Sequence, residues 1–410
     1  MTSSVTPIRS AFVALKNEVE SYLTLNEASI IYACYDTALS SISPEVGFDE
    51  RFLYQSLGTS LDLARLGLRA EFLASALLYY PVSAGTIDRK RIEAQFGGTI
   101  SSVIQKLLNI ENLLEQYLPW QKKRKTSQQS KKAFWDERTK DQSPNFLLAV
   151  TKDIPEVAVI KVVDRLHLLR GIEQLVSEAT FQQGLAEEAL RVHAQVAERL
   201  GIWEIKWQLD DAAFKILQPE MYQAIKRDLN ERRMEREEIV NRAVAILLKA
   251  LATEGLKADV IGRPKHIYGL YLKMRQLGQS IKQVNDNLGL RIIVNTEPEC
   301  YQALDILHRT WPPIEGIYGD KLFRDWIASP KLNGYQSIHT TVSYTNDENR
   351  LLEVQIRTYD MHDVAEYGIA THWIYRKAGN KIRAQLKYQK EAEDTAEIRR
   401  SIEKRRKRKK

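Results

Sequence analysis

The 410-residue chain is poor in the residues that build disulfide scaffolds, zinc sites and membrane spans. It has two cysteines, Cys34 and Cys300, and neither stands in a CxxC or comparable metal-ligand spacing. No disulfide framework or zinc site is therefore indicated, and a reducing compartment is expected. No uninterrupted apolar run approaches the ~20 residues that a membrane helix requires, and no signal-peptide pattern opens the chain. These absences predict a cytoplasmic protein without a membrane partner.

Histidine is also scarce, and it is missing from the first part of the chain. The sequence has seven histidines, of which the first is His167. Imidazole is a common protein ligand for transition metals, whereas a tyrosine phenol with a pKa near ~10 is a poor ligand at neutral pH. Residues 1–166 therefore lack the two histidines that a transition-metal site built on imidazole ligands would need.

The formal net charge of +7 arises at one end of the chain. Residues 404–410 are all Lys or Arg and carry +7, so the rest of the chain sums to zero. The globular part therefore need not be a general polyanion binder. The tail predicts at most a weak electrostatic contact with RNA, and a frayed solubilising end is an equal alternative.

Hydrophobic periodicity indicates an α+β protein in which an all-α half precedes a mixed-sheet half. The helical period dominates residues 10–118, 157–173 and 185–200, and it continues through a charge-laced stretch at 219–251. The basic segment 121–142 reads as an exposed loop. After Gly255, strands are predicted at 258–261, 290–295, 335–344 and 351–357, and helices at 265–277, 298–311 and 361–376.

Residues 330–342, Pro-Lys-Leu-Asn-Gly-Tyr-Gln-Ser-Ile-His-Thr-Thr-Val, combine several side chains that suit nucleotide recognition. Lys331 can meet a phosphate as a point charge, Asn333 and Gln336 can hydrogen-bond a base or ribose, and Tyr335 offers a stacking face. A tyrosine in a β-rich run more often serves packing, so the neighbouring residues carry this hypothesis.

Two carboxylates are predicted to meet at one end of the sheet. Asp286 precedes one expected strand and Glu353 lies near the start of another. Such a pair suits Mg²⁺, which usually takes one or two protein carboxylates together with phosphates and water. The alternative is an exposed turn aspartate and a strand-edge glutamate paired with Arg357.

Basic side chains gather where a short strand is expected to meet a helix. Lys273 lies seven or eight positions after His266 and Lys265, a spacing that places residues on one helical face. With Arg263 they would form a cationic wall, for which a solvated basic helix face is the alternative. Arg291, Arg324 and Lys331 add further candidate phosphate contacts.

These motifs closely resemble the synthetase domain of the RelA/SpoT family, which makes guanosine tetra- and pentaphosphate. The resemblance covers Gly-Arg-Pro-Lys-His-Ile-Tyr at 262–268, residues 286–294, 330–342 and 353–358, and the segment 361–368 followed by His372 and Trp373. It implies a nucleotidyltransferase-like synthetase fold over 255–380, after a helical domain at 1–200 and a connector at 201–254. Residues 381–410 would form a charged helix and tail.

The resemblance also implies a role for each candidate residue. Asp286 would be a ligand of Mg²⁺, and Glu353 would act with the metal or on the ribose 3′-hydroxyl. Arg263 would lie near the adenine of ATP, with the triphosphate held by Lys265, His266, Lys273, Arg291 and Arg324. The acceptor GDP or GTP would contact Lys331, Asn333, Tyr335, Gln336 and His339. His362, Glu366 and His372 match family positions and are interpreted as mainly structural.

Two departures from the family pattern leave details open. Leu322-Phe323-Arg324-Asp325 keeps only half of the charge pattern linked to acceptor choice, so GDP and GTP remain alternatives. The serine usual after the Arg-Pro-Lys-His-Ile-Tyr motif is Gly269, which removes one hydroxyl near the donor.

A weaker resemblance to the HD-type hydrolase domain of the same family covers most of residues 25–200. The metal-ligand positions are replaced, because the family's first histidine aligns near Gln55 and its His-Asp and acidic pairs fall at Tyr79-Tyr80 and Ser83-Ala84. Asp164-Arg165-Leu166-His167 still matches the region of the family's fourth metal ligand. The expectation is a domain without hydrolase activity that packs against the synthetase. The chain also ends about where the synthetase ends, so regulatory carboxy-terminal domains are not expected.

The sequence thus predicts a GTP/GDP diphosphokinase that uses ATP and Mg²⁺ and lacks hydrolase activity. A nucleotide-sensing pseudoenzyme and an RNA-associated regulator without turnover remain the alternatives. The oligomeric state is left open.

Overall fold

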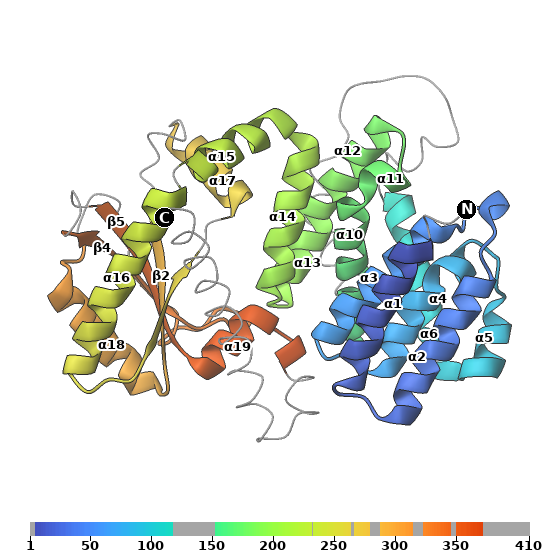
Figure 1. The fold of residues 1–410 in the computed structure, drawn as a ribbon, viewed down its shortest axis with the longest axis horizontal. Helices are drawn as coiled ribbons and strands as arrows, with labels where there is room; N and C mark the ends of the chain where they lie inside the picture. The colour runs from blue at the N-terminus through green and yellow to red at the C-terminus, as the bar shows by residue number, and fades with distance from the viewer. Residues whose placement is uncertain are drawn as a thin grey trace, which may run out of the picture.

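The computed structural model describes residues 5–117, 152–231, 233–263, 266–278, 288–314, 323–345 and 350–371. A helical bundle formed by the first half of the chain lies beside a β-sheet with its covering helices (Figure 1). The loop predicted at 121–142 and the tail lie outside the described residues. Among those residues, no helix has both the length and the apolar character needed to cross a bilayer.

The bundle consists of helices that share one hydrophobic core. In chain order they are α1 (Val5–Glu20), α2 (Leu25–Ser40), the 3₁₀ turn η1 (Pro44–Val46), α3 (Glu50–Arg65), α4 (Ala70–Ser83), α5 (Arg89–Phe96), α6 (Gly98–Tyr117), α10 (Pro155–Arg170), α11 (Ile172–Leu175), α12 (Ala179–Glu188), the π-helical turn η3 (Ala189–His193), α13 (Ala194–Arg199) and α14 (Trp203–Leu217).

Helix α10 lies at the centre of this bundle. It packs against α3, α4, α6, α13 and α14, so most of its residues are buried on all sides. A helix surrounded in this way also buries polar residues, here Lys161, Asp164 and Arg165. Buried charges require partners, and the neighbouring helices supply them.

The predicted connector is divided between the two halves. Ile205, Leu209 and Ala213 of α14 belong to the core of the bundle. Helix α15 (Pro219–Glu231) packs against α17 (Ile267–Leu277), and the small core between them includes Phe214 and Leu270. Helix α16 (Arg233–Thr253) lies against the sheet.

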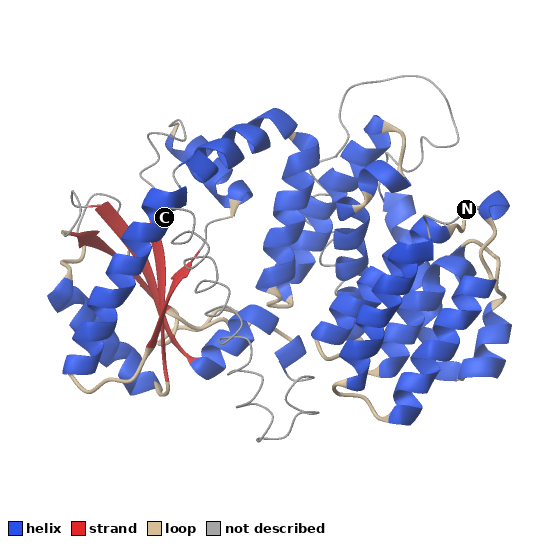
Figure 2. Cartoon of the chain, viewed as in Figure 1, coloured by secondary structure: helices blue, strands red, loops and turns tan. Residues whose placement is uncertain are grey.

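The described strands form one mixed five-stranded sheet, shown in red in Figure 2. Its order is β1-β2-β5-β4-β3, in which only β2 and β5 run parallel. The strands are β1 (Asp259–Arg263), β2 (Leu288–Val294), β3 (Phe323–Asp325), β4 (Ile338–Tyr344) and β5 (Arg350–Thr358). The short strand β3 was not predicted.

One face of the sheet is covered by α16 and α18 (Glu297–Thr310). Alternate strand residues point into this apolar layer, among them Leu290, Ile292, Val354 and Ile356. Because side chains alternate across a strand, the residues between them face the opposite side. Helix α19 (Tyr359–Tyr367) packs on that opposite side and also contacts α14.

The motif at 330–342 departs from the predicted strand at its beginning. Strand β4 starts at Ile338, so Tyr335 belongs to the preceding loop. The cause is the Asn-Gly turn: Gly334 has a φ of 78°, and the Lys331 N–H donates to the carbonyl of Tyr335. A left-handed glycine closes such a turn without steric cost.

Candidate nucleotide site

The candidate site occupies the face of the sheet opposite α16 and α18. Arg291 of β2, His339 of β4 and Glu353 of β5 alternate with residues of the apolar layer, so all three face this side. Strand pairing aligns Arg291 with Gln355, Gln355 with His339, and His339 with Arg324. Residues far apart in the sequence thus form one row across four strands.

A second row brings Arg263 beside Glu353. Gly289 pairs with Arg263 on one side and with Glu353 on the other. A β-carbon at Gly289 would lie 3.0 Å from the Arg263 carbonyl oxygen and 3.1 Å from its β-carbon. The missing side chain lets the Arg263 guanidinium reach within 3.8 Å of the Glu353 carboxylate. The pairing of Glu353 with Arg357, the alternative considered above, is not the arrangement found, because Arg357 pairs with Glu366.

The magnesium pair is described only in part, because Asp286 lies outside the described residues. Lys265 of the predicted cationic wall lies outside them as well. Glu353 fits the metal by chemistry and position, since its partly buried carboxylate offers hard oxygen ligands on the site face beside Arg263. One protein carboxylate with substrate phosphates already meets the usual demand of Mg²⁺.

Two guanidinium groups form the inner end of the site. Arg291 and Arg357 each lie 3.0 Å from the same Glu366 oxygen, and Arg357 also donates to Nδ1 of His362 at 2.9 Å. Burial and the neighbouring Arg357 lower the pKa of Arg291 to about 10, which still leaves it cationic at neutral pH. Glu366 and His362 therefore orient the arginines, in agreement with the structural role predicted for them. Arg357 was missed as a site residue, although its place in the Glu-x-x-x-Arg pattern of β5 offered a signal.

His266 alters the predicted cationic wall. It is the N-cap of α17, and its ring stacks on Trp207 of α14 at 4.0 Å with an interplanar angle of 9°. Burial, with Arg263 nearby, lowers the pKa of His266 to about 4. The imidazole is neutral near pH 7 and supplies a ring and not a charge, so its predicted place in the cationic wall was wrong. Lys273 is half-buried on α17, and its side chain interacts with another group.

The acceptor loop, residues 331–336, is enclosed by aromatic rings. Tyr335 is buried, with 8% of its surface exposed, and its hydroxyl lies 2.8 Å from Nε2 of His339. The Lys331 ammonium lies 5.1 Å from the centre of the Tyr335 ring. The open stacking face predicted for Tyr335 is therefore absent from this conformation.

The remaining predicted residues lie around this loop. Asn333 donates to the carbonyl of Glu198 at 2.9 Å, which ties the loop to the helical bundle. Gln336 is half-buried at the entrance to β4. Arg324 is exposed on β3, with its guanidinium 5.9 Å from the centre of the Trp326 ring. No local pattern predicts the approach of Trp203 from α14 to this loop, because Trp203 precedes the loop by more than a hundred positions.

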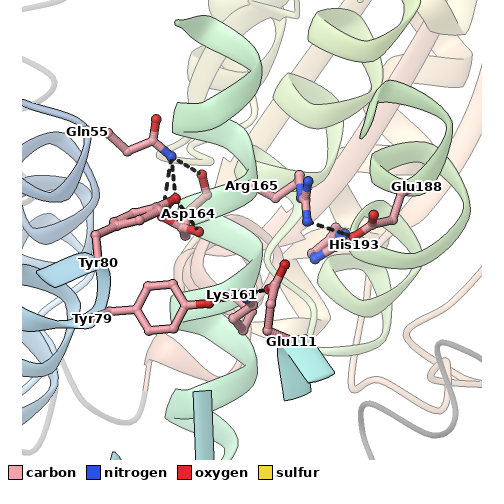
Figure 3. Close-up of polar contacts among 9 residues, drawn as sticks. All are labelled: Gln55, Tyr79, Tyr80, Glu111, Lys161, Asp164, Arg165, Glu188 and His193. Carbon is pink, nitrogen blue, oxygen red and sulfur yellow. Dashed lines mark hydrogen bonds and ion pairs between the residues drawn. The ribbon is translucent and has the colours of Figure 1, made fainter. Parts of the chain in front are cut away.

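In the helical bundle, Gln55, Tyr80 and Asp164 stand where the family resemblance places metal ligands. These three residues bond to one another (Figure 3). The Tyr80 hydroxyl lies 3.1 and 3.2 Å from the two carboxylate oxygens of Asp164, and Gln55 donates to the Tyr80 hydroxyl at 3.1 Å. Burial raises the pKa of Tyr80 well above its ordinary value, so the phenol keeps its proton and donates it to Asp164. Within the described part of the chain, no cluster of three or more His, Cys, Asp or Glu residues could hold a metal ion.

A protein cation lies beside this cluster. The Lys161 ammonium bonds to the carboxylate of Glu111 and lies 3.3 Å from the Tyr79 hydroxyl. Farther along α10, Arg165 donates to Glu188 at 2.8 Å, next to the buried His193. The hollow lined by Thr59, Tyr79, Lys161 and Asp164 has no room for a water molecule.

Comparison with known proteins connects both halves to one family. A family profile described as "Region found in RelA / SpoT proteins" matches residues 262–380, and an HD domain profile matches residues 38–203. Over 328 residues the chain is 37% identical to a probable guanosine-3′,5′-bis(diphosphate) 3′-pyrophosphohydrolase of Synechocystis sp., covering 79% of this chain and 39% of that protein. Over 326 residues it is 34% identical to a GTP pyrophosphokinase of Streptomyces coelicolor, covering 80% and 35%.

The chain spans well under half the length of these curated relatives. Among solved structures, it is similar to the small alarmone synthetase 1 of Bacillus subtilis bound to its product pppGpp. The identity is 24% and the TM-score 0.27, covering 44% of this chain and 98% of that one.

Proposed function

Because the chain belongs to the RelA/SpoT family, we propose that it transfers a pyrophosphoryl group from ATP to the 3′-hydroxyl of GDP or GTP, forming AMP and ppGpp or pppGpp. The observation that supports this most is the shared face of the sheet, on which Arg263, Arg291, His339 and Glu353 converge from four strands. Cations and a carboxylate in one partly buried place are the groups that such a transfer requires.

In the proposed reaction, the acceptor 3′-oxygen attacks the β-phosphorus of ATP, and the bond from that phosphorus to the α,β-bridging oxygen breaks. AMP leaves with the electron pair, and Glu353 takes the proton of the 3′-hydroxyl. Arg263 and Arg291 supply guanidinium groups that neutralise charge on the transferred group. A bound Mg²⁺, held by Glu353 with Asp286, would gather the phosphate oxygens.

The acceptor is assigned to the loop between β3 and β4. Lys331 meets its phosphates, while Asn333, Gln336 and His339 form the surrounding polar contacts. Tyr335 forms one wall of this pocket. The choice between GDP and GTP depends on residues around Arg324, where the family pattern is only half kept.

Incubation of the purified full chain with ATP, Mg²⁺ and labelled GDP or GTP tests the proposal. We expect a more phosphorylated guanosine product and stoichiometric AMP. Glu353→Gln and Asp286→Asn should each reduce turnover by at least a thousandfold while circular dichroism stays unchanged. No product with either acceptor at high protein concentration would refute the proposal.

We further propose that the helical bundle does not hydrolyse ppGpp, although relatives of this chain carry the hydrolase name. The Tyr80 hydroxyl donates to the Asp164 carboxylate, Gln55 donates to the same carboxylate at 3.4 Å, and Lys161 lines the same hollow as Asp164. A divalent cation there would be repelled by Lys161 and would have to displace the phenol. Labelled ppGpp incubated with the protein and Mn²⁺ should remain intact, and pyrophosphate release that Asp164→Ala abolishes would contradict this.

A further inference from the structure

Helix α14 of the helical bundle carries two tryptophans that reach opposite parts of the candidate site. Trp203 and Trp207 are four positions apart, so they lie on one side of the helix about 6 Å apart along its axis. Asp211 follows at the same spacing. Trp203 contacts the loop at 331–336, whereas Trp207 and Asp211 contact the adjacent residues 266–268, which makes this edge of α14 continuous with the site.

Trp203 contacts the acceptor loop. Its ring lies 6.1 Å from the ring of Tyr335, and the Lys331 ammonium lies 5.7 Å from its centre. Trp326 and Tyr335 complete the enclosure, at 5.0 and 5.1 Å from the same ammonium. The Trp203 indole N–H is buried and has no hydrogen-bond partner in the described part of the chain, so the ring face is what it offers to Lys331.

The turn before α14 is fixed against the synthetase half on two sides. The Asn333 side chain donates to the carbonyl of Glu198, and the Ile369 N–H donates to the carbonyl of Leu200 at 3.0 Å. Gly201 and Gly368 meet at this point, and both have positive φ values, 76° and 53°. A β-carbon on Gly368 would lie 2.3 Å from the Leu200 carbonyl oxygen. Trp203 therefore has a defined position relative to Lys331.

Trp207 contacts the donor side. Its ring stacks flat on His266, which directly precedes α17. One turn later, Asp211 accepts hydrogen bonds from the backbone N–H groups of Ile267 and Tyr268, at 3.4 and 2.8 Å. The first turn of α17, next to the Arg-Pro-Lys-His motif, is thus held by α14.

We propose that α14 is a positioning element for both nucleotides, in which Trp203 fixes Lys331 for the acceptor and Trp207 fixes His266 and the donor motif for ATP. This inference rests on the proposed function and adds that the helical bundle contributes directly to the synthetase site. An unconstrained lysine side chain samples many rotamers, and three ring faces restrict its ammonium to one region. Neither tryptophan is assigned a contact with the reacting atoms.

Steady-state kinetics of two matched variants test the assignment. Trp203→Leu should raise the KM for the acceptor about tenfold, the order expected for loss of a desolvated cation–π contact, while the KM for ATP changes less than threefold. Trp207→Leu should show the reverse selectivity. Trp203→Phe keeps a ring face and should restore most of the acceptor KM. Lys215→Leu, an exposed position on the same helix, controls for a general effect on α14.

A double variant isolates the route through Lys331. If Trp203 acts by fixing this lysine, Trp203→Leu should add less than a further threefold to the acceptor KM of Lys331→Met. Equal loss for both substrates, a fall in kcat with both KM values unchanged, a lower acceptor KM in Trp203→Leu, or full additivity with Lys331→Met would each overturn the inference.

The outcome for the wild-type chain separates the two proposals. Turnover in the wild type with no selective effect of either substitution refutes the role of α14 alone. If the wild type makes no product, the proposed function fails. Calorimetric titration of GDP, GTP and a non-hydrolysable ATP analogue into wild type and both tryptophan variants then decides the inference by the same selectivity, and unselective or absent binding refutes it.

Discussion

Replacing Lys161 by Met tests whether a protein cation stabilises the helical bundle in the region where the family resemblance places a metal that this chain was predicted not to bind. The Lys161 side chain is 3% exposed and pairs with Glu111, which is 28% exposed. Methionine keeps the approximate shape and removes the charge, leaving the Glu111 carboxylate without its main partner. Removal of one partner of a buried ion pair costs about 3–5 kcal/mol. We expect about 3 kcal/mol, because Glu111 keeps some contact with water and the Arg165 charge remains nearby.

Differential scanning calorimetry or thermal circular dichroism measures the effect at pH 7. For a domain of roughly 150–250 residues, 1 kcal/mol lowers Tm by about 2–4 °C, so the expected loss is about 6–12 °C. The double variant Lys161→Met/Glu111→Leu removes both charges and should recover most of this loss, since an apolar pair of similar volume is often as stable. A loss below ~2 °C in the single variant, or an equal loss in the double variant, would refute the reasoning.

The pH dependence provides a second check on the same variant. Burial raises the pKa of Glu111, but Lys161 and Arg165 outweigh it, so the net shift in the wild type is downward. That lowered pKa gives stability that is present above the unfolded pKa and lost as pH falls through the folded value. Without Lys161 the contribution of burial gains weight and the carboxyl protonates more readily. The difference between variant and wild type should therefore shrink from pH 7 to pH 5.

Three further outcomes are expected. Burial lowers the pKa of His266 and of His339 to about 4. The free energy of unfolding should therefore fall as pH drops from about 6.5 towards 4. Urea titrations of His266→Gln should show a weaker dependence of this free energy on pH. Gly368→Ala should lower Tm and raise the acceptor KM, because the alanine β-carbon would collide with the Leu200 carbonyl. An unchanged Tm and KM would show that the backbone at Gly368 shifts freely. Millimolar Mn²⁺ or EDTA should change the Tm of the helical bundle by less than ~1 °C. A metal present at a hundred times its Kd would instead add about 2.7 kcal/mol of stability. A clear rise of Tm with Mn²⁺ would mean that the Tyr80 cluster still binds metal.

Local periodicity predicted most elements of the sheet half with small errors at their ends. Strands β2 and β5 lie within two residues of the predicted ranges, and α17 and α18 begin and end near theirs. The helix predicted at 361–376 departs more, because α19 ends at Tyr367, before Gly368 with its φ of 53°. The start of β4 was wrong where turn chemistry overrides β propensity. Asn333-Gly334 turns the chain, and Ile338 is the first residue whose partner on β5 continues the ladder. Strand β3 was missed because three residues hold too little pattern to be recognised.

The site was predictable only where its residues belong to one motif. Glu353 was predicted near the start of a strand and lies on β5, where the register through Gly289 brings Arg263 beside it. No sequence pattern shows that His266 is stacked and neutral, because its pKa depends on burial against a helix more than fifty positions earlier. The enclosure of Lys331 depends in the same way on long-range contacts, which composition and spacing do not encode.

The two halves are connected through the same helix that completes the core of the bundle. Ile205, Leu209 and Ala213 of α14 are buried in that core, while Trp203 and Trp207 contact the half that holds the sheet. Helix α14 packs on α10, which carries Lys161, Asp164 and Arg165. The Tyr80 phenol and the Lys161 ammonium occupy the region where the family resemblance places a metal. These contacts within the chain hold α10, and with it α14, which packs on α10. The helical bundle thus supports the segments at 266–268 and 331–336 that α14 contacts.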